Sequence, residues 1–71
     1  MPISARNQLT GTVIAVKEGI VTAEVTVELD GGQEVVSVIT VTSVQDLGIK
    51  VGTPVTVIIK STAVMLGVDD E

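Results

Sequence analysis

The stretch from Ile20 to Val41, IVTAEVTVELDGGQEVVSVITV, decides the fold of this 71-residue chain. Its first half alternates apolar and polar residues, a period of two that is typical of a β-strand with one buried face. Asp30-Gly31-Gly32 then predicts a hairpin turn, followed by a second strand over Glu34–Val41. The residues expected on the buried face of the first strand, Ile20–Leu29, are Val21, Ala23, Val25, Val27 and Leu29.

The preceding segment, Thr10–Lys17, predicts a strand with apolar residues on both faces. Alternation places Val13 and Ala15 on one face and Ile14 and Val16 on the other. A strand of this kind is covered on both sides. In so short a chain, we expect the second cover to come from another subunit.

The remaining elements follow the hairpin. Thr42–Gly48 predicts one short helical turn, with its start capped by Thr42 and Gln45 or by Ser43 and Asp46, and its end formed by Gly48. After a turn at Gly52–Pro54, we predict a strand over Val55–Ser61 and another over Ala63–Val68. Residues 69–71 are expected to form a solvated tail.

Strands at roughly ten-residue spacing with one helical turn indicate an all-β fold, a small OB-like five-stranded Greek-key barrel. A sandwich-like small β domain is the alternative. The length predicts a single domain over residues 1–71. A domain of this size buries little surface, and 45% of the residues are hydrophobic, so we expect it to be oligomeric.

The composition excludes several function classes. The net charge of −5 and the absence of aromatic residues argue against nucleic-acid binding, which needs clustered cations and stacking platforms. With no Cys and no His, the chain has neither a thiolate nucleophile nor a side chain that titrates near neutrality, so we expect no enzyme and no metal-ion site. No apolar run is long enough to span a membrane and no signal peptide opens the chain, so we expect a cytoplasmic protein without a membrane partner.

Two short segments concentrate the remaining chemistry. Ser4–Asn7 and Lys60–Thr62 together hold two of the four basic residues, Arg6 and Lys60, each close to a serine. Hydroxyls, cations and free backbone amides are the donors that a small oxyanion needs. The alternative is an ordinary surface Arg and an outward-facing Lys at a sheet edge.

Two further clusters are weaker candidates. Thr40, Thr42 and Ser43 lie at a junction between strand and helix, where free amides can bind an anion or where the hydroxyls simply cap the helix. The turn Glu18–Thr22 is either a plain hairpin turn or one whose amides face a symmetry axis.

Four segments together resemble the Mop or molbindin family over nearly the whole chain. They are ISARNQLTGTV from Ile3, GIVTAEV from Gly19, TSVQDLG from Thr42 and IKSTAVM from Ile59. The resemblance implies an OB-like protein of the TOBE type that binds molybdate or tungstate. It also implies a hexamer built as a trimer of dimers, which stores or buffers the oxyanion in the cytoplasm.

The resemblance further implies two classes of site, with no cofactor and no separate metal-ion site, because the metal enters as the oxyanion. The first class would lie between subunits. One subunit would supply Ser4, Ala5, Arg6, Lys60 and Ser61, and a second subunit would supply Ser43 and Thr40, or Thr42 in its place. The second class would lie near three-fold axes, at Gly19, Ile20 and Thr22.

Other functions remain open at this point. A molybdate-sensing regulatory module that acts on another protein is the main alternative to storage. An OB-type nucleic-acid binder is disfavoured by the charge and by the missing aromatic residues.

Overall fold

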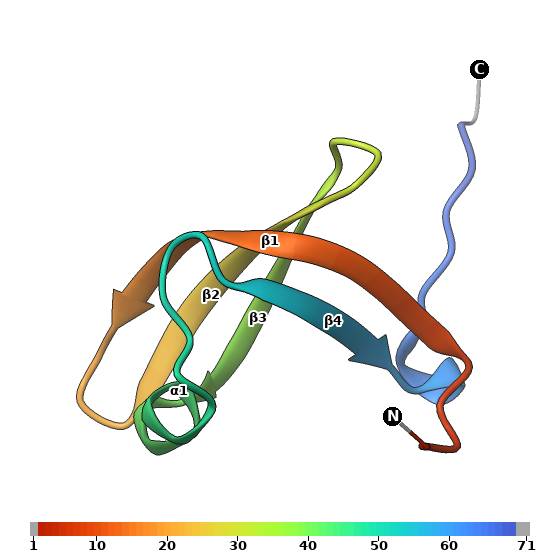
Figure 1. Ribbon diagram of the computed structural model, residues 1–71. Helices are drawn as coiled ribbons and strands as arrows, with labels where there is room; N and C mark the ends of the chain where they lie inside the picture. Colours follow the sequence, from red (N-terminus) through yellow and green to blue (C-terminus); the bar gives the residue numbers. More distant parts are fainter. Residues whose placement is uncertain (1, 70–71) are drawn as a thin grey trace.

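The computed structural model describes residues 2–69, which form four strands, one α-helix and one 3-10 turn. The elements in chain order are β1 (Asn7–Glu18), β2 (Thr22–Leu29), β3 (Glu34–Thr40), α1 (Val41–Leu47), β4 (Pro54–Ile59) and η1 (Ser61–Ala63). All pairings are antiparallel, in the order β3-β2-β1-β4. This order is that of a Greek key. The strands make one curled sheet (Figure 1), so the predicted all-β class is confirmed and the sandwich alternative is wrong.

The core forms on the concave side of the sheet, largely from the alternating residues of β2. Ala23, Val25 and Val27 are buried there as predicted, together with Val13 of β1 and Val44 of α1. Val21 is an exception, because β2 begins at Thr22 and leaves the Val21 side chain 69% exposed in the preceding turn. Among the described residues, the buried hydrophobic side chains are therefore these three of β2 together with Val13 and Val44.

A β-bulge changes which residues of β1 face the core. Val13 pairs with Val27 but Ala15 pairs with Thr26, so Ile14 is the extra residue. An extra residue reverses the alternation beyond it. Val16 therefore packs against the core with Val13, and Ala15 is exposed. The predicted assignment of Ala15 and Val16 was wrong because residue types alone do not show a shift in register.

Glycines allow the hairpin and the close packing of the first two strands. Gly32 has a φ of +94°, and its amide donates to the Leu29 carbonyl at 2.9 Å, which closes the predicted turn between β2 and β3. A Cβ atom at Gly11 would lie 2.6 Å from the backbone oxygen of Glu28. Real Cβ atoms essentially never come that close, so only glycine fits where β1 crosses β2 at this point.

The helix α1 starts one residue earlier than predicted and has a different cap. The Thr40 side chain accepts a hydrogen bond from the Ser43 amide at 3.0 Å, so Thr40 is the N-cap in place of Thr42 or Ser43. At the other end, Gly48 has the left-handed conformation (φ +66°) that the sequence predicted. Val44 anchors the helix in the core over one end of the sheet.

The predicted fifth strand at Ala63–Val68 is wrong. After β4 the chain makes the η1 turn, and no strand follows in residues 64–69. Val64 is extended (φ −85°, ψ 125°), but the segment leads away from the sheet (Figure 1), so it has no strand to pair with. Met65, Leu66 and Val68 are 93–94% exposed. Of the predicted tail, Asp69 is exposed, whereas Asp70 and Glu71 lie outside the described residues.

Candidate functional site

The pairing of β1 with β4 brings two of the candidate segments together. Asn7 is opposite Ile59 in the register, so Ser4–Arg6 and Lys60–Ser61 leave the sheet side by side at the same end. The Asn7 side chain strengthens this junction, because its Nδ2 atom donates to the Ile59 carbonyl at 3.2 Å. One chain thus supplies two cations and two serine hydroxyls at a single end of the sheet.

The backbone around these cations is rich in available donors. Arg6, Lys60 and both serines are exposed, and Ala5 is half-buried. Within residues 2–69, no backbone carbonyl accepts from the amides of Ser4, Ala5, Arg6, Lys60 and Ser61. Neighbouring carbonyls are engaged: Ala5 accepts from the Gln8 side chain at 2.8 Å, and Lys60 accepts from the Ala63 amide at 2.9 Å. An anion would meet N–H and O–H groups here.

Thr40 and Ser43 form a second donor cluster at the start of α1. The Thr40 hydroxyl donates to the Ser43 Oγ atom at 2.8 Å, while the Ser43 amide donates back to the Thr40 hydroxyl. With its own oxygen serving as acceptor, the Ser43 hydroxyl keeps its hydrogen for a further partner. Thr42 is exposed in the first turn of α1 and takes no part in this pair.

The turn between β1 and β2 lies next to that cluster. Thr22 is opposite Thr40 in the register of β2 and β3, and the Val41 amide donates to the Val21 carbonyl at 2.9 Å. Within the turn, the Gly19 amide donates to the Thr22 carbonyl at 2.8 Å, so it is already used. Ile20 at the tip is 98% exposed.

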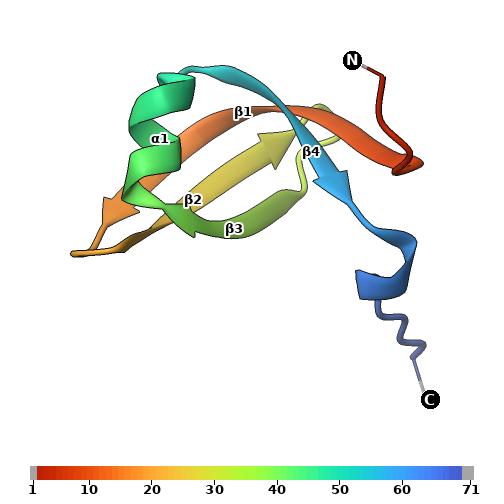
Figure 2. The same ribbon diagram turned by 90° about the horizontal axis from the view of Figure 1, so that it is seen from below.

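The two donor groups lie at opposite ends of the molecule. In Figures 1 and 2, the start of β1 and the η1 turn are on one side, while α1 and the turn between β1 and β2 are on the other. A single chain therefore brings Ser4, Ala5, Arg6, Lys60 and Ser61 together, and separately Thr40 with Ser43, but it does not join the two groups.

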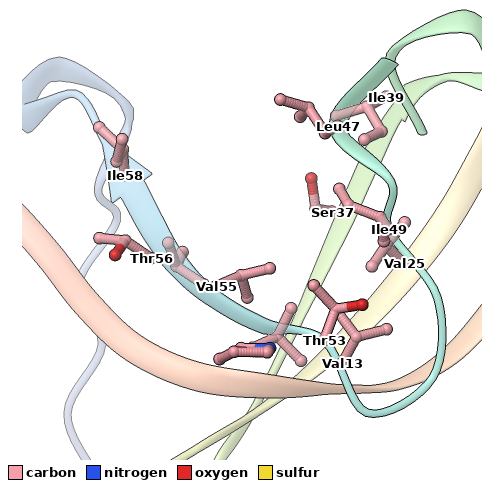
Figure 3. A pocket seen from close by; sticks show the side chains of 13 residues that line it. Val13, Val25, Ser37, Ile39, Leu47, Ile49, Thr53, Val55, Thr56 and Ile58 are labelled. Carbon is pink, nitrogen blue, oxygen red and sulfur yellow. The ribbon is translucent and has the colours of Figure 1, made fainter. Parts of the chain in front are cut away.

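A groove that the sequence did not predict runs along the concave side between β3 and β4 (Figure 3). It encloses about 520 Å³, and its walls include Val25, Ile39, Leu47, Val55 and Ile58. The polar residues among those that line it are serine and threonine, and no charged residue lines it. The groove therefore suits aliphatic side chains and offers no compensation for a dianion.

Two other kinds of site are not found in the part of the chain that the structure describes. No group of three or more His, Cys, Asp or Glu side chains is placed to hold a metal ion in residues 2–69. None of the helices in that range has the length and apolar character needed to cross a membrane.

Known proteins resemble this chain in sequence and in overall fold. Residues 3–66 match the TOBE domain family. Molybdenum-pterin-binding protein 3 of Clostridium pasteurianum is 59% identical over 66 residues, which cover 93% of this chain and 97% of that protein. The structure is similar to apo MopII from the same organism (TM-score 0.89, 49% identity, 94% of this chain and all of that one).

A second similar structure is that of the cytoplasmic molybdate-binding protein ModG with molybdate bound. Its TM-score is 0.93 at 46% identity, and the match covers 97% of this chain but 49% of ModG. Family match, identity over nearly full length and shared fold lead to one assignment. The chain belongs to the TOBE domain family, among the molybdenum-pterin-binding (Mop) proteins.

Proposed function

We propose that this protein binds molybdate or tungstate in cages formed between copies of the chain. The observation that carries the proposal is the division of the donors between two ends of one molecule. Ser4, Ala5, Arg6, Lys60 and Ser61 of one copy would enclose one side of the anion. Thr40 and Ser43 of another copy would complete the cage. The Thr40–Ser43 hydrogen bonds favour Thr40 over Thr42 for this role: they engage the Thr40 hydroxyl hydrogen, so Thr40 would orient Ser43, whose hydroxyl would donate to the anion.

The chemistry of the donor set supports this class of ligand. Molybdate and tungstate are dianions without a proton at neutral pH, so they need only donors. Hydrogenphosphate carries an O–H group, which would lose its partner in a site without a free acceptor. No carboxylate belongs to the proposed cage. Sulfate also lacks a proton and differs mainly in size, so its rejection would depend on the radius of the cage.

The shape of the chain supports the assembly that such a cage requires. Its radius of gyration is 13.4 Å, whereas a compact chain of this length would have about 11 Å. Met65, Leu66 and Val68 are almost fully exposed, and the groove between β3 and β4 is lined mainly by aliphatic side chains. We propose a homo-oligomer, a hexamer built as a trimer of dimers, in which residues 64–68 of one copy occupy the groove of another.

Within this proposal, residues 1–71 form a single Mop domain that stores the oxyanion and buffers its concentration in the cytoplasm. A second class of site would use Gly19, Ile20 and Thr22 near the three-fold axes. Because the Gly19 amide is bonded within its own turn, we expect this second site to depend on Ile20 and Thr22. The proposed role is binding and release without catalysis, in keeping with relatives that are named as binding proteins.

Native mass spectrometry with and without molybdate tests the proposal. We expect one multimer whose mass increases by whole numbers of molybdate ions, together with a higher melting temperature, because a ligand that binds only the folded assembly stabilises it by mass action. Tungstate should compete for the same sites, and hydrogenphosphate at equal concentration should not. A single chain that acquires no mass from molybdate would refute the proposal.

A further inference from the structure

Gln8 makes a contact that neither the sequence nor the family comparison assigns to the site. Its Nε2 atom donates to the backbone oxygen of Ala5 at 2.8 Å, although Gln8 itself is exposed in β1. Only the amide nitrogen of a glutamine side chain can donate to a carbonyl, so the orientation of this amide follows from the contact. The bond fastens the loop that carries Arg6 back onto the first residues of β1.

This bond also fixes the direction of one peptide group. Because a trans peptide is planar, the N–H of Arg6 points away from the carbonyl of Ala5. The Gln8 side chain holds that carbonyl on its own side, so the Arg6 N–H is directed to the opposite side. In residues 2–69 that N–H has no backbone acceptor. The Ala5–Arg6 peptide group thus has a free N–H to offer, while its carbonyl is occupied by the Gln8 side chain.

The same arrangement recurs where β4 ends. The Ile59 carbonyl accepts from the Asn7 side chain at 3.2 Å, and the Lys60 carbonyl accepts from the Ala63 amide at 2.9 Å. Three carbonyls beside the two cations are therefore engaged by local donors. A carbonyl turned toward a molybdate oxygen would repel it, whereas the same carbonyl would accept the O–H of hydrogenphosphate.

We propose that Gln8 is a positioning residue that gives the site its preference for unprotonated oxyanions. Because the Gln8 side chain donates to the Ala5 carbonyl, the Ala5–Arg6 peptide would present its N–H to the anion. The same bond occupies a carbonyl that would otherwise accept the O–H of a protonated anion. This inference rests on the proposed molybdate site and adds to it the residue that discriminates against hydrogenphosphate.

The test compares the wild-type protein with Gln8→Met, which keeps the length of the side chain but loses the donor. Calorimetry gives the Kd for molybdate, and displacement of bound molybdate gives the Kd for phosphate. We expect the ratio of phosphate Kd to molybdate Kd to fall at least about fivefold in Gln8→Met. Gln8→Glu, which keeps the shape but repels the carbonyl, should shift the ratio in the same direction. Gln33→Met is the matched control, because Gln33 is exposed in the turn between β2 and β3.

The outcomes separate this inference from the proposed function. If the wild-type protein binds no molybdate, the proposed function fails. If the wild type binds molybdate and both Gln8 variants keep the wild-type ratio, the role given to Gln8 is wrong, even if the variants bind both anions more weakly. A merely structural role would weaken both ligands by the same factor and leave the ratio unchanged.

Discussion

Replacing Lys60 with alanine is expected to raise the Kd for molybdate by about 10- to 100-fold, and Arg6→Ala should act similarly. A hydrogen bond to a charged group contributes about 1.5–3 kcal/mol, and each 1.4 kcal/mol changes a Kd tenfold. Both residues are exposed at the end of the sheet where β1 starts and β4 ends, outside the core. The variants should therefore keep the wild-type fold and assembly while losing affinity, as measured by isothermal titration calorimetry.

Lys50→Ala is the matched control for these two variants. Lys50 is also an exposed lysine, but it lies in the connection between α1 and β4 and is not one of the proposed cage residues. Its removal lowers the net charge by the same amount, so any general electrostatic effect would appear equally in this variant. Affinities within about twofold of wild type for both Lys60→Ala and Arg6→Ala would show that the anion does not bind at this end.

The second large effect is expected from Leu66→Asp. Leu66 is 94% exposed in the single chain, but in the proposed assembly it lies against the groove of another copy. Burying an unpaired carboxylate there is costly, so the variant should dissociate to single chains. Because each cage needs two copies, the same variant should lose molybdate binding although Leu66 is not a cage residue. Size-exclusion chromatography with light scattering gives the mass of the assembly.

Gln33→Asp provides the control, since it adds the same charge at an exposed polar position of the hairpin. We expect it to keep the mass and the affinity of the wild type. If Leu66→Asp also elutes as the intact multimer with bound molybdate, then residues 64–68 do not hold the copies together.

Local patterns were sufficient to predict most of the sheet. The alternation of Ala23, Val25 and Val27 identified the core face of β2, and the glycines after Asp30 identified the hairpin. The features that were missed depend on pairing between strands. The bulge at Ile14 changes no residue type, so alternation placed Ala15 and Val16 on the wrong faces. Thr40 became the N-cap because its strand ends there, which the spacing of Thr42 and Gln45 did not show.

The fifth strand and the candidate site show a different limit. Residues 63–68 have the composition of a strand, but β-propensity reflects packing against neighbours, and the single chain gives this segment none. Likewise, the sequence alone suggested Ser4–Arg6 and Lys60–Ser61 as donors, and the register of β1 and β4 shows them adjacent. The role of Gln8 was not predicted, because residue order does not show which carbonyl a glutamine side chain reaches.

The most direct measurement is diffraction from crystals grown with tungstate, because the anomalous signal of tungsten locates each bound ion. The account predicts a tungsten peak between two copies of the chain, within hydrogen-bonding distance of Lys60 and Ser61 in one copy and of Ser43 in the other. A tungsten peak enclosed by a single chain, a peak in the aliphatic groove, or no peak at saturating tungstate would contradict it.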